Sequence, residues 1–348
     1  MNFYPDFTQL LKVLNRESPD RPVLFEFFLD DPVYERFAGR SFPEGTTWPH
    51  LDKLHERGMI EIDAFHNAGF DHATVRASAF DVMYYTFPDK GKAESVSMNE
   101  GNHIYDRESF ASFPWCEPED FDDSHLDTLS DYLPDNMKFL IGGPCGILEI
   151  VIQLMGYERL CYLLFDDPEL LEEIFEAVGD RFLRYYRGAL RHESVGAIIY
   201  NDDWGFNTGP MISPDDIKRL VFPWVQRIVA EAHKAAIPSI IHSCGNLYGP
   251  IMEGIIDELN FDAKHSYQDI ILPVEDAYER LHERIAVLGG LDVDYLMSSS
   301  PEEIERRSRY LLERSAERGG YALGSGNSIT KSIPKESFDA MRRAAGRL

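Results

Sequence analysis

Short apolar runs alternate with longer amphipathic stretches along most of the chain. The apolar runs show little alternation of polar and apolar positions, which is typical of parallel strands covered by helices on both faces. Eight such runs predict strands within residues 22–28, 69–77, 138–148, 195–205, 238–246, 259–268, 285–293 and 320–328.

Helical patterns separate nearly all of these runs. Residues 166–192 form an amphipathic pattern that begins with acidic residues, which the positive end of a helix dipole favours. Residues 213–235 predict a second helix, with Ser213 as its N-cap and a proline directly after it. Strands that alternate with helices indicate the α/β class with right-handed crossovers.

Eight strand–helix units predict a (β/α)8 TIM barrel, a single parallel barrel that fills a chain of 348 residues. We therefore expect one domain over residues 1–348, with the barrel at about 20–348. A doubly wound open sheet is the alternative. An irregular acidic stretch at about 86–135 predicts an insertion after the second strand, built as a long loop or short helices.

Charge and composition exclude several classes of protein. The chain has 60 acidic and 34 basic residues, a net charge of −26, which argues against nucleic-acid binding and against anionic membrane surfaces. It contains no apolar run of about 18 residues, and its first residues lack the features of a secretory signal. These features predict a cytoplasmic protein, whose four cysteines serve as free thiols or ligands.

Polar residues gather where the predicted strands end. In a (β/α)8 barrel this end carries the active site. Any one of these residues is also explained by a strand that simply meets water, but the set taken together favours a site. The members are Glu26, Arg76, Cys145, Asp202, Asp203, His242, Cys244, His265, Asp292, Ser325 and Asn327.

The most specific pair is His242 and Cys244, which lie two residues apart at the end of an apolar run. Residues i and i+2 of a strand share a face, so both side chains are able to point at one metal ion. Imidazole and thiolate are good zinc ligands, and a catalytic zinc site needs a third ligand from the protein. The available donors are Glu26, Asp202, Asp203 and His265.

Two of these donors have simpler explanations as well. Adjacent side chains diverge, so at most one of Asp202 and Asp203 faces the barrel mouth, and an Asp-Asp turn also serves to cap the segment that follows. His265 is also explained as an ordinary histidine at the end of a strand.

Several motifs together resemble a known superfamily. They are "RPVLFEFF", "GGPCGILE", "NDDWGFNTGPMISPDDIKRLVFPWVQRIV", "IIHSCGN", "KHSYQD", "LGGLDV" and "GSGNSI". They span about residues 20–348 and resemble the superfamily of uroporphyrinogen decarboxylase and the corrinoid-dependent methyltransferases. The resemblance implies a (β/α)8 barrel, in agreement with the strand pattern.

The methyltransferases of this superfamily bind zinc through an HxC pair and a further cysteine at the end of the last strand. Here His242 and Cys244 match the pair, but Asn327 or Ser325 occupies the third position. Either a carboxylate such as Glu26 completes the site, or the metal is absent or weakly held.

The other residues at the strand ends are expected to act in catalysis or substrate binding. We expect Asp202, Asp203 and His265 as catalytic residues. Arg76, Asn327 and Asp292 are expected to bind substrate. The corrinoid would be carried by a partner protein, and the resemblance suggests a homodimer.

The sequence favours methyl transfer over decarboxylation. Glu26, Asp30 and Asp31 follow the first predicted strand, where a porphyrinogen with eight carboxylates needs cationic anchors. The leading hypothesis is methyl transfer between a small methylated substrate or thiol and a corrinoid protein. The alternatives are uroporphyrinogen decarboxylase activity and a barrel that binds a small molecule without catalysis.

Overall fold

Parallel strands that follow one another along the chain build the central sheet. The computed structural model describes residues 3–45, 53–78, 98–99, 103–116, 121–143 and 145–348. Within this part, one sheet has the order β1-β2-β3-β6-β7-β8-β9 and all its pairings are parallel. A doubly wound sheet reverses its strand order, so that alternative is excluded. The strands are β1 His72–Arg76, β2 Lys138–Gly142, β3 Val195–Asn201, β6 Ser239–His242, β7 Ala263–His265, β8 Ala286–Leu288 and β9 Tyr321–Ala322.

The predicted eight-stranded barrel is confirmed in part. The α/β class and a curled parallel sheet of seven strands are present, and seven of the eight predicted runs contain a strand of that sheet. The first predicted run, 22–28, is joined to the last one by an isolated bridge, Leu24 to Leu323, and a second bridge, Leu29 to Ile329, lies directly after both runs. Among the described residues no ladder joins it to β1, so closure by eight hydrogen-bonded strands is not shown.

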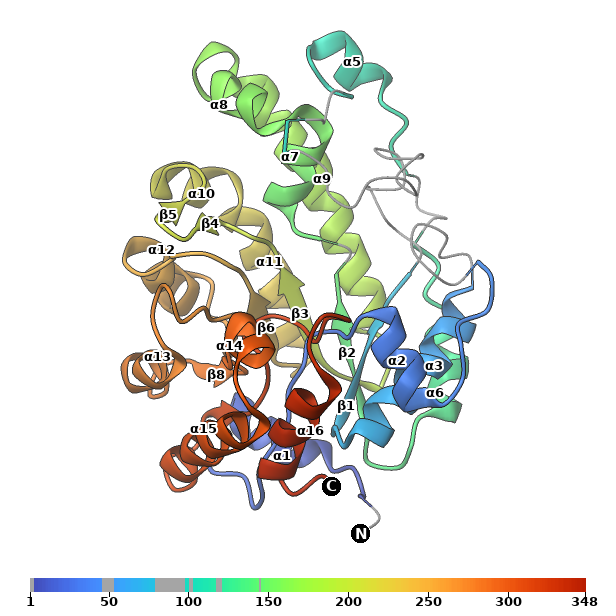
Figure 1. The fold of residues 1–348 in the computed structure, drawn as a ribbon. Coiled ribbons are helices and arrows are strands. Elements are labelled where there is room, and N and C mark those ends of the chain that lie inside the picture. The colour runs from blue at the N-terminus through green and yellow to red at the C-terminus, as the bar shows by residue number, and fades with distance from the viewer. Residues whose placement is uncertain (1–2, 46–52, 79–97, 100–102, 117–120, 144) are drawn as a thin grey trace.

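The inside of the curled sheet is filled by small and branched side chains. α1 (Phe7–Leu14) lies below the strands and contributes Leu10 and Val13 to this inner cluster (Figure 1). Its N-cap, Asp6, accepts a hydrogen bond from the backbone N–H of Thr8. The strands and the first predicted run contribute Val23, Phe25, Phe27, Leu140, Ala197, Ile199, Ile240, Ala263, Ala286, Leu288 and Ala322. Because α1 covers the lower end, the inside is a packed core and the upper end is the one available for chemistry.

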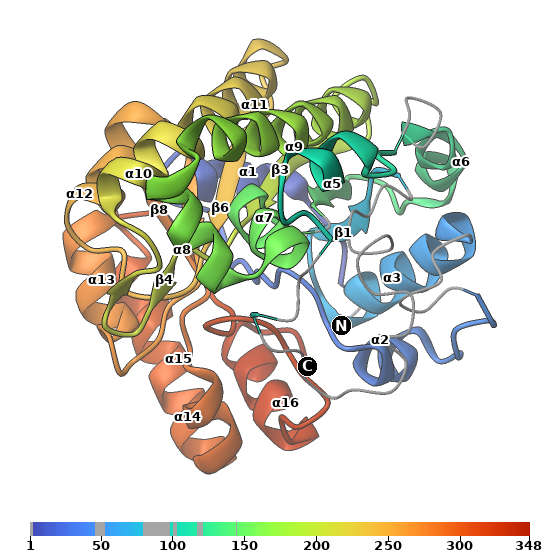
Figure 2. The same ribbon diagram turned by 90° about the horizontal axis from the view of Figure 1, so that it is seen from above.

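An outer layer of helices surrounds the sheet (Figure 2). The predicted helix at 213–235 is two helices, α10 (Pro214–Leu220) and α11 (Phe222–Lys234). Pro223 lies in the first turn of α11, where its missing N–H costs nothing, whereas inside one continuous helix it would remove a hydrogen bond. The other surrounding helices include α3 Leu54–Ala68, α9 Pro168–Ala189, α13 Val274–Leu281, α15 Pro301–Ser315 and α16 Lys335–Ala344.

The upper side, opposite α1, carries additional elements (Figure 1). They are α5 (Arg107–Ser112), α7 (Ile147–Met155), α8 (Tyr157–Asp166) and the hairpin of β4 (Gly205–Phe206) with β5 (Gly209–Pro210). The described part of the predicted insertion contains α5 and α6 (His125–Tyr132), while residues 86–97, 100–102 and 117–120 lie outside the described residues. No helix among the described residues is both long enough and apolar enough to cross a membrane.

Three further helices complete the described fold. α2 (Asp31–Ala38) packs against α3 and ends at Gly39, whose positive φ of 71° stops the helix. α12 (Pro250–Glu253) continues into a short π-helix, η3 (Gly254–Glu258). α14 (Val293–Ser298) begins after β8 with Asp292 as its N-cap.

The contact between α1 and the inside of the sheet predicts a large effect of truncating Leu10, which is fully buried. Replacing Leu10 with alanine should destabilise the protein by about 2–5 kcal/mol, because the transfer free energy is lost and a cavity remains. Leu348→Ala, at a side chain that is 67% exposed, should change stability by less than about 0.5 kcal/mol. Urea denaturation of both variants measures the difference, and equal midpoints would show that α1 is not part of the core.

Candidate metal centre at the carboxyl ends of the strands

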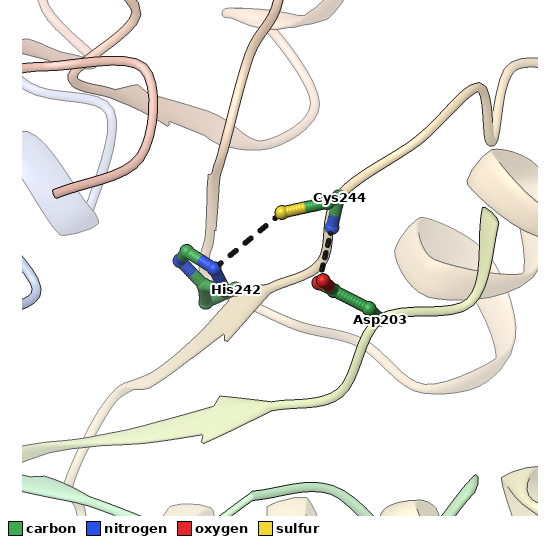
Figure 3. Close-up of side chains that lie close together, drawn as sticks. All are labelled: Asp203, His242 and Cys244. Atoms are coloured by element: carbon green, nitrogen blue, oxygen red, sulfur yellow. Dashed lines mark hydrogen bonds between the residues drawn. The ribbon is translucent and has the colours of Figure 1, made fainter. Parts of the chain in front are cut away.

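Asp203, His242 and Cys244 bring three ligand-type atoms together above the inner core. One ligand atom from each lies within 4.8 Å of the others. In the described part of the chain, these three residues form the group that could hold a metal ion. The Cys244 sulfur lies 3.8 Å from Nε2 of His242. Figure 3 shows the cysteine and histidine side chains pointing toward each other from the end of β6, with Asp203 approaching from the segment after β3.

Strand register explains this convergence. Asn201, at the end of β3, pairs with His242, at the end of β6, so the segments that leave the two strands start side by side. The backbone N–H of Cys244 donates to Oδ1 of Asp203 at 2.8 Å, which joins the two segments directly. Gly245 follows with φ of 90°, and a Cβ there would lie 2.1 Å from the carbonyl oxygen of Gly205. Only glycine allows this close approach.

The three donors fit zinc in type, and their atoms lie within 4.8 Å of one another. Nitrogen, thiolate sulfur and carboxylate oxygen are its usual ligands, and bonds of about 2.0–2.3 Å place tetrahedral ligand atoms about 3.3–3.8 Å apart. The sulfur and the imidazole nitrogen already have this separation. Asp203 has a second carboxylate oxygen besides the one that accepts from Cys244. Three protein ligands on a tetrahedral ion would leave one position open.

Burial controls the charge of the site. It lowers the pKa of His242 well below the usual value, so this imidazole is neutral at physiological pH, as a metal ligand must be. Burial, with the Asp203 charge, raises the pKa of the Cys244 thiol to about 12. Thiolate at neutral pH therefore requires a cation at this point.

Polar groups surround the Cys244 sulfur on other sides. Nδ2 of Asn327 donates to Sγ at 3.3 Å, and the Ser266 hydroxyl lies 3.5 Å from it. Lys264, only 3% exposed, donates to the carbonyls of Ser243 and Ser266. Burial lowers the pKa of Lys264 to about 8, while Cys244 and Asp203 act in the opposite direction. The ammonium partly offsets the negative charge that a thiolate and Asp203 place here.

His265 lies beside His242 at the end of β7. The two residues are register partners, and their Nδ1 atoms are 2.8 Å apart. Nε2 of His265 lies 3.1 Å from the carbonyl oxygen of Ser325. Burial lowers the pKa of His265 to about 3, so this imidazole is also neutral. His265 thus contacts a member of the candidate metal group and is not itself part of it.

Glu26 lies outside the three-residue metal group, although the sequence suggested it as third ligand. Its two oxygens accept hydrogen bonds from the backbone N–H and the hydroxyl of Ser325, at 2.7 and 2.6 Å. Alternation explains the position. Phe25 and Phe27 face inward, with rings 5.1 Å from His265 and 4.8 Å from His242, which sends Glu26 to the other side of the segment.

Asp202 and Asp203 diverge, as adjacent side chains should. Asp202 is fully buried, and its carboxylate accepts from the backbone N–H groups of Leu148 and Glu149 in the first turn of α7. Gly146 leaves room for it, because a Cβ there would lie about 2 Å from the Asp202 side chain. Burial raises the pKa of Asp202 to about 6. Asp202 thus anchors α7, whereas Asp203 belongs to the candidate metal group with His242 and Cys244.

A cleft opens beside the metal group, with a volume of about 670 Å³. Asn327 connects the two, since it lines the cleft and contacts the Cys244 sulfur. Asp292 also lines the cleft, but its oxygens accept from the backbone N–H groups of Asp294, Tyr295 and Asp269. Among the described residues that line the cleft there is no lysine or arginine.

Arg76 lies in a different environment from Asn327 and Asp292. It ends β1, its carbonyl accepts a hydrogen bond from His125, and its charge acts on the buried carboxyl of Glu61 in α3. It does not appear among the described residues that line the cleft.

Sequence reasoning singled out neither Lys264 nor Glu149, although both lie close enough to Asp203 to interact with its charge. Glu149 is the third residue of α7, close enough to Asp203 and Asp202 that their charges add to burial in raising its pKa well above the usual value. The signals were weak: a lysine inside an apolar strand, and a glutamate three residues after a glycine at a helix start. Neither pattern is specific enough to identify a site.

Comparison with known proteins confirms the resemblance seen in the sequence. A family model described as uroporphyrinogen decarboxylase matches residues 126–348. The uroporphyrinogen decarboxylase of Anaeromyxobacter dehalogenans is 24% identical over 220 residues, 61% of this chain and 58% of that protein. The enzyme of that name from Myxococcus xanthus is 27% identical over 195 residues, which are 53% of this chain and 51% of that protein. This chain spans little more than half the length of these curated relatives.

A solved structure agrees with the observed architecture over the whole chain. A methyltransferase from Methanosarcina mazei matches with a TM-score of 0.76 and 16% identity, covering 99% of this chain and 98% of that one. At this identity the similarity concerns the fold alone.

The Glu26 environment predicts a pH dependence of stability. Burial raises the pKa of this carboxyl to about 8, from 4.5 in an ordinary environment. Between these values the unfolded chain is ionised and the folded protein is not, so stability attributable to Glu26 is complete below pH 4.5 and is lost as the pH rises toward 8. The limiting slope is about 1.4 kcal/mol per pH unit.

Glu26→Gln should remove this contribution. Denaturant unfolding of both proteins between pH 5 and 9 measures it, since the difference between the two curves cancels the other titrating groups. The variant should lose less stability than the native protein as the pH rises. Parallel curves would show that Glu26 titrates normally in the folded protein.

Proposed function

Because this chain belongs to the uroporphyrinogen decarboxylase family, we propose that it is an enzyme of the methyltransferase-like type within that family. The proposed reaction moves a methyl group between a small methylated substrate or thiol and a corrinoid carried by a partner protein. The observation that supports this most strongly is the convergence of Asp203, His242 and Cys244 within 4.8 Å beside an open cleft.

In this proposal, Asp203 is the third ligand in place of the cysteine that the resemblance implies. A bound zinc ion would supply Lewis acidity, lowering the pKa of a thiol or polarising a methylated oxygen or nitrogen. The Asn327 amide stabilises negative charge on the Cys244 sulfur by donating to it. Lys264 offsets part of the remaining negative charge from the buried side.

The cleft is the proposed substrate site, and its charge restricts what can bind. Its lining includes Asp269, Asp292 and Asp294, with Tyr267 and Tyr295 as aromatic surfaces. The guanidinium of Arg307, which contacts the cleft residue Asp269, is paired with both Asp269 and Glu275. Such a lining favours a small neutral or cationic molecule over an anionic one.

The partner is proposed to approach from the upper side, where the cleft and the metal group lie. Aromatic side chains on that side are exposed: Tyr162 and Phe165 on α8 and Phe206 on β4 are 60%, 86% and 41% exposed. Exposed aromatic side chains are frequent in protein interfaces and support docking of a corrinoid protein here.

Uroporphyrinogen decarboxylation is the second candidate, because the family model and the curated relatives carry that name. A substrate with eight carboxylates would meet the carboxylates of Asp269, Asp292 and Asp294 in the cleft. Incubation with uroporphyrinogen, followed by chromatography of the products, tests it directly. Loss of carboxyl groups at a steady turnover would replace the methyl-transfer proposal.

Zinc binding is the first prediction of the proposed function. After addition of zinc and removal of the excess, the native protein should retain about one equivalent, and His242→Ala and Cys244→Ala should retain less than roughly a tenth. Cys161→Ala, which removes a thiol from α8, is the matched control and should bind zinc normally. Equal metal contents in all four proteins would contradict the assigned ligands.

Methyl transfer is tested with methylcobalamin as donor and 2-mercaptoethanol as acceptor. In this reaction the thiolate sulfur gains the methyl group, and cobalt keeps the electron pair of the broken cobalt–carbon bond. The zinc-loaded native protein should accelerate the absorbance change of the corrinoid. Cys244→Ala should reduce this rate at least about 100-fold, because a ligand is lost, whereas Cys161→Ala should not. A native rate no higher than that of Cys244→Ala would contradict methyl transfer.

A further inference from the structure

His265 makes a hydrogen-bonded contact at each of its two ring nitrogens. Its Nε2 lies 3.1 Å from the carbonyl oxygen of Ser325, and its Nδ1 lies 2.8 Å from Nδ1 of His242. All three groups are nearly or completely buried, since His265, His242 and Ser325 are 0%, 7% and 0% exposed. Protein groups therefore determine where the ring protons reside.

The positions of the protons follow from donor and acceptor rules. A carbonyl oxygen only accepts, so Nε2 of His265 carries a proton and donates it to Ser325. A neutral imidazole has one N–H, which leaves Nδ1 of His265 as an acceptor. The contact between the two Nδ1 atoms then requires a proton on Nδ1 of His242. Nε2 of His242, the atom 3.8 Å from the Cys244 sulfur, is then the unprotonated ring nitrogen and keeps its lone pair on the side of the thiol.

We propose that His265 is a positioning residue that holds His242 in the Nδ1–H tautomer, so that Nε2 of His242 faces the metal group as a ready ligand. The tautomer itself is a property of the metal-free protein. Only its role in preparing a metal ligand rests on the proposed function. In metal sites generally, the outer hydrogen bond of a ligating histidine fixes both its tautomer and its ring orientation.

The Ser325 carbonyl must be held in place if it is to fix the proton on Nε2 of His265. Glu26 accepts from both the backbone N–H and the hydroxyl of Ser325. Gly289 leaves space on the other side, because a Cβ there would lie 2.2 Å from the Ser325 oxygen and 3.0 Å from Nε2 of His265. Glu26, Ser325 and His265 thus form a chain of contacts that ends at His242, and this chain gives Glu26 a role outside the metal group.

Packing fixes the two rings as well. Phe25 contacts the ring of His265 and Phe27 contacts that of His242, with centroids 5.1 and 4.8 Å apart. Both phenyl rings belong to the inner core beside the imidazoles, and close packing there restricts rotation of the imidazole rings. The hydrogen bonds therefore select the tautomer and the aromatic contacts keep the ring planes in place.

Long-range proton–nitrogen NMR on the metal-free native protein tests the proposal without any substitution. The ring of His242 should show a protonated Nδ1 and an unprotonated Nε2, and the ring of His265 should show the reverse. The opposite tautomer for His242 would overturn the proposal. This result does not depend on whether the protein binds zinc or transfers methyl groups, so the two proposals fail separately.

Variants at position 265 test the functional consequence. His265→Leu removes the acceptor and should lower zinc affinity about 10- to 100-fold and change the tautomer signals of His242. His265→Asn offers an acceptor oxygen in place of Nδ1 and should recover most of the affinity. His282→Leu, which removes another buried imidazole, controls for general disruption and should leave His242 unchanged.

Zinc affinity is measured by competition with a chromophoric chelator, and circular dichroism checks that each variant is folded. A folded His265→Leu variant with native tautomer signals and native zinc affinity would overturn the proposal. Loss of affinity in His265→Leu together with recovery in His265→Asn would support it. If His265→Leu does not fold, the NMR spectrum of the native protein and the zinc affinity of His265→Asn still test the proposal.

Discussion

Alternation of side chains along β6 and β7 is the constraint on which the rest of the site depends. Ile240 and Ala263 point into the inner core, so His242 and His265, two residues later on each strand, point the same way one layer higher. Parallel pairing with matched register then places the two imidazoles side by side. A shift of one residue in either strand would turn an imidazole toward the helices and remove the contact.

This constraint also explains what the sequence was able to predict. The apolar runs predicted seven strands of the sheet, and the spacing of His242 and Cys244 predicted that both would face one point. Asp203 was visible only as one of four candidate donors, with Glu26, Asp202 and His265. Register between strands, which decides that choice, depends on tertiary pairing that the local pattern does not contain.

Other features depended on contacts between distant residues. Glu26 and Ser325 are 299 positions apart in the chain, and isolated bridges such as Leu24 to Leu323 place their two segments side by side. The break between α10 and α11 was marked by Pro223, yet the amphipathic pattern continues across it and predicted one helix. The insertion at 86–135 has too little periodicity to predict where α5 and α6 begin.

Charge has two separate effects in this molecule. Many acidic residues form ion pairs with arginine or lysine side chains, whereas Asp269, Asp292 and Asp294 line the cleft at the upper end. Burial keeps Glu26 largely protonated, whereas Asp203 faces the imidazole and the thiol. Among the described side chains, Lys264 brings a positive charge to this point, and a cation bound at Asp203, His242 and Cys244 would add to it.

X-ray absorption spectroscopy at the zinc edge of the zinc-loaded protein tests the central claim most directly. One sulfur at about 2.3 Å, with nitrogen or oxygen atoms at about 2.0–2.2 Å, is the predicted coordination. A shell without sulfur, or one with two or more sulfurs, would contradict a centre built from Asp203, His242 and Cys244.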